Sequence, residues 1–232
     1  MNEEEKKRGE NTGPARKKRP VENAIPLEHT WTLWYDEKTS KGMQKSEYQN
    51  AIMPIGSFDT VQNFWRYWNN LEPNKFPANS NLRMFKRNIK PMWEDPANAK
   101  GGKWSLSCAK ETSGKYLGQL VLAVIGEQFV SSERLCGVVF QVRRYNDTLS
   151  LWTSDSSDVS YVDSTAKQIA RLLELGKESD LIFLPHKDLM EMNKEKALSR
   201  GSGGYRSHHR SRSHAGNAGS SHMHAMKRRG EG

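Results

Sequence analysis

Apolar residues recur at helical spacing in two segments and are nearly continuous in a third, and glycine or capping residues mark where these segments begin or end. Asp59, with Gln62 three residues later, predicts the start of the first helix. Gly126 and Gly176 predict the ends of the second and third helices, because glycine readily adopts the backbone conformation that closes a helix. The three predicted helices are Thr60–Leu71, Tyr116–Ile125 and Val162–Leu173.

Segments that alternate in polarity or are rich in aromatic residues lie between these helices and predict strands. Asn146-Asp147 separates two of them and is a residue pair that favours a tight hairpin turn. The predicted strands are Trp31–Tyr35, Lys103–Cys108, Gly137–Arg144, Thr148–Thr153 and Asp180–Leu184. Hairpin-linked strands with separated helices indicate an α+β fold, with helices on one face of a largely antiparallel sheet.

The chain has 232 residues, of which 35% are hydrophobic and 27% are charged. This is leaner in apolar residues than an average globular domain, so we expect part of the chain to lie outside a core. No apolar run approaches the ~18 residues of a membrane span, and the N-terminus lacks a signal-peptide pattern, so we expect no membrane contact and no secretion. The only cysteines, Cys108 and Cys136, are too few for a disulfide framework or a structural zinc site, which favours a reducing compartment.

The formal net charge of +9 is concentrated at the two ends of the chain. Residues 1–20 carry a net charge of +3 and residues 201–232 a net charge of +5, which leaves +1 for the body. A nearly neutral body does not favour a domain that binds duplex phosphates through a basic face. We therefore divide the chain into a tail at 1–24, a folded domain at 25–198 and a second tail at 199–232.

Both tails lack apolar periodicity, which predicts disorder. In the first, Lys6-Lys7-Arg8 and Arg16-Lys17-Lys18-Arg19 are typical of a bipartite nuclear-import signal, with a solvated tail as the equal alternative. The second holds five of the seven histidines, which we do not interpret as a metal site because nothing fixes their geometry. Its arginines leave general RNA binding by the tails as one hypothesis; they are Arg206, Arg210 and Arg212.

Signatures of common catalytic sites are missing: the sequence has no Gly-x-Ser-x-Gly, no phosphate-binding P-loop, no His-Glu-x-x-His and no Cys-x-x-Cys. The body contains only His29 and His186, which leaves little for a Cys–His or Ser–His pair. We therefore expect a protein that is not an enzyme and that uses no cofactor and no metal.

Seven tryptophans lie in the body, and core packing is the default explanation for each. Trp93 is the exception, because it lies beside Glu94 and Asp95 in a loop flanked by Pro91 and Pro96, and loops are surface features. An aromatic face next to a carboxylate suits a flat, cationic ligand that donates hydrogen bonds. The ring attracts the cation, and the carboxylate accepts two parallel N–H bonds.

The predicted helix Thr60–Leu71 carries a second candidate surface. Its apolar arc is wide enough for Phe64 and Trp68 to face the core, while Trp65 falls at the edge beside Val61. An exposed Trp–Val stripe predicts a docking site for a helix of a partner protein. The alternative is a wide helix whose whole apolar arc faces the core.

Several separate motifs resemble those of one known family. They are Phe58-Asp59-Thr60-Val61-x-x-Phe64-Trp65, Phe85-Lys86-x-x-Ile89-Lys90-Pro91-Met92-Trp93-Glu94-Asp95, Gly101-Gly102-Lys103-Trp104, Ile125-Gly126-Glu127-Gln128-Phe129, and Cys136-Gly137-x-Val139 continuing through Val142-Arg143 to Trp152. In order and spacing they are similar to the cap-binding eukaryotic translation initiation factor 4E family over about residues 25–185. The resemblance implies a curved antiparallel sheet backed by three helices on its convex face, with the 7-methylguanosine cap of mRNA in a pocket on the concave side.

The resemblance also implies roles for individual residues in binding the cap base. Trp93 corresponds to one ring of an aromatic sandwich around 7-methylguanine, and Glu94 to the carboxylate that accepts N–H bonds from the base. Tyr48 corresponds to the second ring of the sandwich, which is usually a tryptophan in the family. Trp152 corresponds to the residue that packs against the N7-methyl group of the base. Methylation makes the base cationic, so stacking gains an attraction that unmethylated guanine lacks.

For the cap phosphates, Arg143 matches a binding cation and Lys103 a supporting basic residue. Tyr145 and Thr148 replace two residues that are often lysine in the family. These replacements resemble the divergent 4E-homologous protein branch, which binds caps and mostly represses translation, whereas Trp31 resembles the mainstream branch.

A partner site is implied as well, for scaffold or repressor proteins that carry a Tyr-x-x-x-x-Leu-apolar helix. Its residues here are Pro26, Val61, Trp65, Gln119 and Leu122. We therefore expect a monomer in the cytoplasm, and also in the nucleus if the basic clusters act in import, that binds capped mRNA and such a partner to regulate translation. The alternative is an interaction adaptor with a degenerate cap pocket that acts through Trp65.

Overall fold

The computed structural model describes residues 23–37, 51–176 and 180–201 of the chain. Contacts divide the chain into two units, residues 1–193 and residues 194–232. The second unit is described only up to Gly201, as the end of a helix. The basic clusters, the histidine-rich segment and Tyr48 lie outside the described residues.

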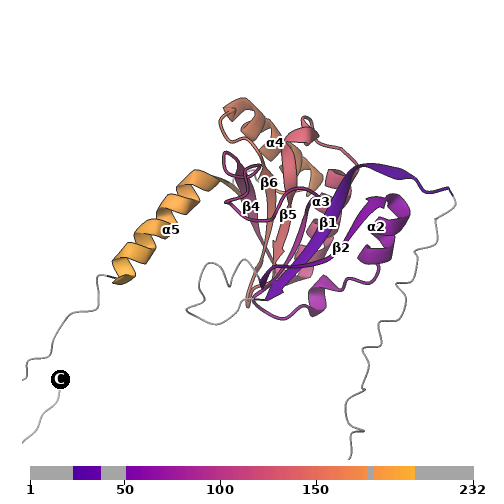
Figure 1. Ribbon diagram of the computed structural model, residues 1–232, viewed down its shortest axis with the longest axis horizontal. Coiled ribbons are helices and arrows are strands. Elements are labelled where there is room, and N and C mark those ends of the chain that lie inside the picture. The colour runs from indigo at the N-terminus through magenta and orange to yellow at the C-terminus, as the bar shows by residue number, and fades with distance from the viewer. Residues whose placement is uncertain (1–22, 38–50, 177–179, 202–232) are drawn as a thin grey trace, which may run out of the picture. The chain divides into compact units, whose positions relative to one another are not determined.

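Seven strands of the described chain form one sheet in which every neighbouring pair is antiparallel (Figure 1). The order across the sheet is β2-β1-β3-β5-β6-β4-β7, so β2 and β7 are its edges. The strands are β1 (Pro26–Glu37), β2 (Met53–Thr60), β3 (Ser80–Lys86), β4 (Gly102–Cys108), β5 (Leu135–Gln141), β6 (Asp147–Thr153) and β7 (Leu181–Pro185). This arrangement confirms the predicted antiparallel α+β fold.

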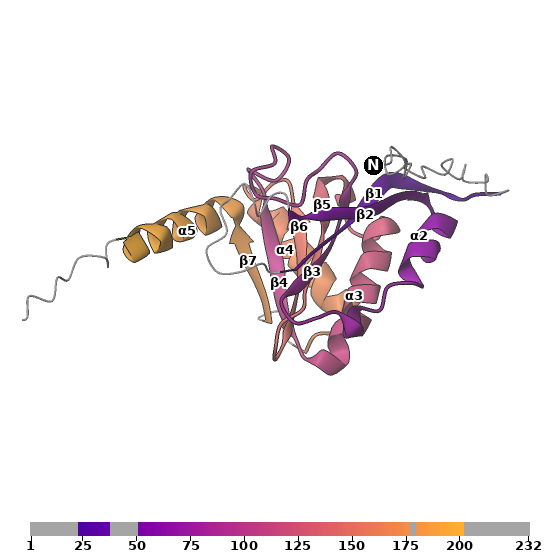
Figure 2. The ribbon, with the colours of Figure 1, turned by 60° about the horizontal axis from the view of Figure 1, so that its bottom comes forward.

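Three helices lie on one face of the sheet (Figure 2): α2 (Val61–Trp68), α3 (Lys110–Ile125) and α4 (Val159–Leu172). The strands follow period-2 alternation, so Trp31 and Leu33 of β1 point into the core beneath these helices while Thr32 and Trp34 point to the other face. The core is one continuous cluster whose largest fully buried side chains include Trp31, Phe58, Phe64, Trp104 and Phe140. The three predicted backing helices are therefore confirmed.

Helix α5 (His186–Gly201) begins directly after β7 and was not among the predicted elements. Its apolar residues are few and do not recur at helical spacing, so the pattern of the sequence does not reveal it. Two short 3₁₀ turns complete the described elements, at Pro73–Lys75 and Ser132–Arg134.

The predicted first helix, Thr60–Leu71, begins one residue too early and ends three residues too late. Asp59 still belongs to strand β2, and the N-cap is Thr60, whose hydroxyl accepts a hydrogen bond from the Asn63 amide. The helix ends at Trp68 rather than at Leu71.

The predicted two-residue turn at Asn146-Asp147 was also wrong, although the hairpin itself is present. Strand β5 ends at Gln141 and β6 begins at Asp147, so the connecting loop is 142–146 and contains Arg143. Asp147 belongs to the strand and not to the turn. Its buried carboxylate pairs with Lys110 and accepts a hydrogen bond of 2.8 Å from the Ser113 hydroxyl, and both partners lie near the start of α3.

Candidate ligand-binding site

The face of the sheet opposite α2, α3 and α4, which we call the outer face, carries rows of side chains that cross the strands. Cross-strand pairing places Phe85 of β3, Gly137 of β5, Trp152 of β6 and Lys103 of β4 next to one another in the first row. A Cβ atom on Gly137 would lie 2.4 Å from the Met84 carbonyl oxygen, so only glycine permits this close packing. The second row is Trp34, Arg83, Val139, Ser150 and Ser105.

The loop at 87–101 connects β3 to β4 and carries Trp93. Asn98 in this loop is fully buried, and its side-chain Nδ2 donates hydrogen bonds of 2.8 Å to the carbonyl oxygens of Lys90 and Met92. One amide group thus holds the backbone on the N-terminal side of Trp93 in place.

Two further contacts fix the same loop. The Asp95 carboxylate accepts hydrogen bonds of 2.9 Å from the backbone N–H groups of Lys90 and Ala97. Arg83 donates a hydrogen bond of 2.9 Å from Nη1 to the Pro91 carbonyl oxygen. Asp95 therefore shapes the loop, and Glu94 beside it is exposed.

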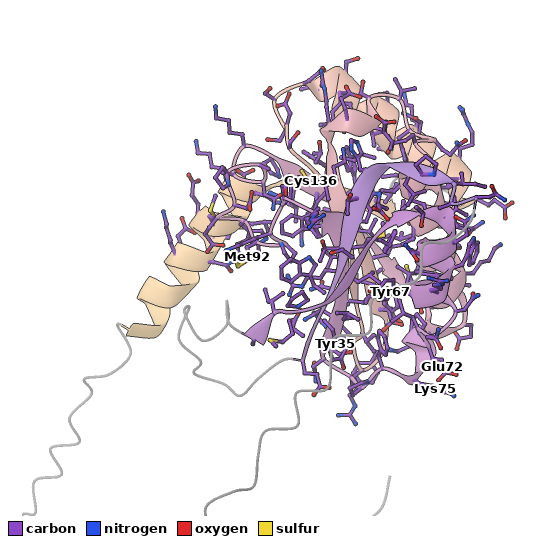
Figure 3. The ribbon with its side chains drawn as sticks, turned by 45° about the vertical axis from the view of Figure 1, so that its right-hand side comes forward. Tyr35, Tyr67, Glu72, Lys75, Met92 and Cys136 are labelled. Atoms are coloured by element: carbon purple, nitrogen blue, oxygen red, sulfur yellow. The ribbon has the colours of Figure 1, made fainter. Side chains whose placement is uncertain are left out.

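Trp93 is half-buried, and it packs against an apolar cluster on the outer face consisting of Phe85, Cys136, Val139 and Trp152. Met92 of the loop and Cys136 of β5 lie on the same side of the molecule, as Figure 3 shows. Trp152 is 4% exposed and meets the Phe85 ring edge-on, with 5.4 Å between ring centroids. The cluster supports the Trp93 side chain, which stays partly accessible.

A buried histidine closes this cluster from the side of β7. His186 lies against Trp152 with 4.3 Å between ring centroids, and its Nδ1 is 2.8 Å from the Asn98 carbonyl oxygen. Because a carbonyl only accepts, Nδ1 carries the proton, and Nε2 is buried with no hydrogen-bond partner among the described residues. Burial lowers the pKa of His186 to about 4, so the imidazole is neutral at physiological pH.

Three cationic side chains share the outer face. Lys103 lies opposite Trp152 and, within the described ranges, makes no hydrogen bond or ion pair. Burial lowers the pKa of Lys103, and the positive charges of Arg83 and Arg143 lower it further. An anionic ligand beside Lys103 would offset both the burial and the repulsion that disfavour its charged form.

The two arginines are held by polar groups of the outer face. Arg83 and Asp36 form a buried ion pair, in which Nε lies 2.8 Å from Oδ1. Asn81 donates to the same carboxylate and accepts a hydrogen bond of 2.9 Å from Nη2 of Arg143. Arg143 also donates through Nη1 to the Ser80 carbonyl oxygen, 3.2 Å away.

The structure thus brings together most of the residues that the sequence predicts at a cap site. Trp93, Glu94, Trp152 and Lys103 belong to one end of the outer face, and Arg143 reaches the same face from the 142–146 loop. Sequence reasoning missed four supporting residues, namely Asp36, Arg83, Asn98 and His186. For Arg83, the alternation of Asn81, Arg83 and Phe85 along β3 was a usable signal.

A second surface forms where the chain enters α2. The Val61 amide donates a hydrogen bond of 2.9 Å to the Ile25 carbonyl oxygen, which places Pro26 beside the start of the helix. Val61 and Trp65 are one turn apart, and Trp65 is 39% exposed. This confirms the predicted exposure of Trp65 and contradicts the alternative in which the whole apolar arc is buried.

Helix α3 supplies the neighbouring part of this surface. A Cβ atom on Gly118 would lie 3.7 Å from the Trp68 ring, so α2 and α3 lie side by side, as Figure 2 also shows. Leu122, one turn after Gly118, is 42% exposed. Gln119 is half-buried, and its Oε1 is buried with no hydrogen-bond partner among the described residues.

No helix in the described ranges is long and apolar enough to cross a bilayer. The same ranges hold no group of three or more His, Cys, Asp or Glu side chains positioned to bind a metal ion. Cys108 and Cys136 are buried and unpaired, and burial raises the pKa of their thiols to about 11 and about 12.

An α+β protein with this outer face, where a supported indole adjoins a carboxylate and an ammonium lies on the neighbouring strand, has the chemistry to bind a flat ligand that carries phosphate. The chain belongs to the eukaryotic initiation factor 4E family, whose model matches residues 26–200. It is 37% identical to eukaryotic translation initiation factor 4E-1 of Zea mays over 170 residues, which cover 73% of this chain and 77% of that one.

Solved structures agree with this family assignment. The complex of C. elegans eIF4E-3 with the 4E-binding protein Mextli and a cap analog matches with a TM-score of 0.67 at 30% identity, covering 72% of this chain and 96% of that one. The Ascaris suum eIF4E-3 complex with m7G cap matches with a TM-score of 0.64 at 31% identity, covering 70% and 92%.

Proposed function

We propose that this protein binds the 7-methylguanosine 5′ cap of mRNA and, with a partner protein, regulates translation. The observation that carries the proposal is the hydrogen-bonded loop that places Trp93, with Glu94 next to it in sequence, against the cluster that contains Trp152. Lys103 lies opposite Trp152 on the neighbouring strand and makes no hydrogen bond or ion pair within the described residues. Family membership supports it, as do the cap analog and m7G cap in the similar structures.

In this proposal Trp93 stacks on the methylated base and Glu94 accepts the N–H bonds of its edge. The positive charge of 7-methylguanine strengthens both contacts, because it is attracted to the ring face and makes the base a better donor. Tyr48 is proposed as the second stacking ring. Trp152, which is 4% exposed, is proposed to pack against the N7-methyl group.

Lys103 and Arg143 are proposed to bind the cap phosphates. Lys103 has no competing acidic partner among the described residues, and the nearby charges of Arg83 and Arg143 make this part of the outer face positive. Phosphate binding would relieve the mutual repulsion of these cations.

A titration followed by tryptophan fluorescence tests the cap proposal. We expect 7-methyl-GTP to bind far more tightly than GTP, and Trp93→Ala or Glu94→Gln to remove this preference. Trp65→Ala, on the partner surface, is the matched control and should leave it intact. Equal affinity of the unmodified protein for the two nucleotides would refute the proposal.

We further propose that Pro26, Val61, Trp65, Gln119 and Leu122 receive a partner helix with the pattern Tyr-x-x-x-x-Leu-apolar. The exposure of Trp65 and Leu122 supports this, and the similar C. elegans protein is in complex with the 4E-binding protein Mextli. Trp65→Ala should reduce binding of such a peptide by at least about tenfold, as expected for a central aromatic contact, and Trp93→Ala should not.

Peptide binding without any nucleotide preference would instead favour the adaptor with a degenerate cap pocket. We propose that the protein is not an enzyme, acts as a monomer in the cytoplasm, and belongs to the 4E-homologous protein branch, as Tyr48, Tyr145 and Thr148 favour. Light scattering of the purified chain tests the monomer, and translation of a capped reporter tests whether the protein activates or represses.

A further inference from the structure

The tip of the 142–146 loop exposes an aromatic ring that the cap proposal does not use. Tyr145 is 76% exposed, more than any other large apolar side chain in the described ranges. The guanidinium carbon of Arg144 lies 5.5 Å from the centroid of this ring. The tip therefore pairs a planar cation with a solvent-facing π surface.

The base of the same loop is fixed. Asp147 pairs with Lys110, accepts a hydrogen bond from Ser113, and accepts another of 3.1 Å from the Arg143 amide. The Asp147 charge is thus neutralised within the protein, and the loop between the strands carries two arginines and no acidic residue. Arg144 and Tyr145 are presented from a rigid, positively charged support.

We propose that Arg144 and Tyr145 bind the first nucleotide that follows the cap, with the tyrosine ring stacked on its base and the arginine near its phosphate. This rests on the proposed function, which places Arg143 at the cap phosphates. Tyr145 is two residues further on, so its Cα lies within about 7 Å of that of Arg143. RNA that continues from those phosphates begins within reach of the ring.

The chemistry of the tip favours single-stranded RNA. Unpaired bases are bound by stacking on tyrosine and on arginine planes, and stacking tolerates any base because each has a π face. The loop also adjoins the outer face through Arg143, whereas the partner surface is formed by α2 and α3 on the other face. A protein helix docked at Trp65 therefore leaves Tyr145 free for RNA.

The experiment compares three probes: 7-methyl-GTP, an RNA of five nucleotides with a 7-methylguanosine cap, and the same RNA with an unmethylated 5′ triphosphate. We expect the capped RNA to bind more tightly than 7-methyl-GTP. Tyr145→Ala should weaken capped-RNA binding by about 5- to 150-fold, the range for loss of one stacked base, and leave 7-methyl-GTP binding unchanged. Tyr145→Phe should retain the affinity, and Val130→Ala, which truncates another exposed apolar side chain, should have no effect.

Unchanged binding of capped RNA by Tyr145→Ala would overturn the inference while the cap preference persists. An equal loss in Tyr145→Phe would also overturn it, because the hydroxyl rather than the ring would then make the contact. A wild-type protein that does not prefer 7-methyl-GTP over GTP would instead refute the proposed function.

Discussion

The imidazole of His186 packs on the indole of Trp152, with 4.3 Å between ring centroids, and its Nδ1 donates to the backbone of Asn98. Asn98 in turn holds the loop that carries Trp93. The start of α5 and the proposed cap loop are therefore parts of one buried assembly, and changes at either end should alter ligand binding.

Asn98→Ala should destabilise the protein and weaken cap binding. The carbonyls of Lys90 and Met92 would lose their donor, and a buried polar group without a partner costs about 1–3 kcal/mol. Urea unfolding measures the loss, and a 7-methyl-GTP titration measures the effect on binding. Asn70→Ala is the control, because Asn70 is exposed and makes one hydrogen bond of 2.7 Å to Arg66. A loss no larger than that of the control would contradict the role of Asn98.

His186 should make stability depend on pH. Its pKa of about 4 in the folded protein lies below the usual 6.5, so the unfolded chain binds the proton more tightly. The stability that His186 contributes is complete above pH 6.5 and is lost as the pH falls towards 4, in total about 3 kcal/mol. Urea unfolding at several pH values measures this slope. His186→Gln should flatten it, and an unchanged slope in that variant would rule the mechanism out.

Lys103→Gln should discriminate between base and phosphate contacts. If Lys103 binds phosphate, the variant loses about 10-fold or more in affinity for 7-methyl-GTP, the usual value of a hydrogen bond between charged groups. Affinity for 7-methylguanosine, which has no phosphate, should not change. Lys100→Gln removes an exposed lysine just before β4 and serves as the control. Equal losses for the two ligands would assign Lys103 to the base instead.

Breaking the buried pair of Asp36 and Arg83 should be costly. Asp36→Asn leaves the guanidinium without its counterion, and removing one partner of a buried pair costs about 3–5 kcal/mol. Glu72→Gln is the control, because Glu72 and Lys75 form an exposed pair (Figure 3), whose loss costs about 0–1 kcal/mol. If urea unfolding shows similarly small decreases in the free energy of unfolding for both variants, the buried pair does not stabilise the protein more than the exposed one.

The sequence predicted the elements that carry a clear local signal. Helices α2 and α4 have a regular apolar period, α3 is a long apolar run that ends at Gly126, and β4 alternates, whereas polar residues interrupt β3 even though the strand is buried almost throughout. Strand β2 contains Pro54 and Gly56, which weaken its pattern, and α5 has too few apolar residues. These three elements were missed for those reasons.

For the site, too, residues in local sequence motifs were predicted and contacts between distant residues were not. Trp93, Glu94 and Trp65 lie in local motifs, so their neighbours in sequence already indicated their surroundings. The contact of Asn98 with His186 joins residues 88 apart, and that of Asp36 with Arg83 joins residues 47 apart. Such contacts depend on the order of strands in the sheet, which no local pattern contains.

The hydrogen bonds of Asn98 and Asp95 have a kinetic consequence. Because these hydrogen bonds already hold the loop, the protein would lose little conformational entropy on binding a ligand at Trp93 as proposed. Association at this ring should therefore run at the rate of oriented diffusion, without waiting for the loop to close. Differences in affinity between nucleotides would then arise mainly from their dissociation rates.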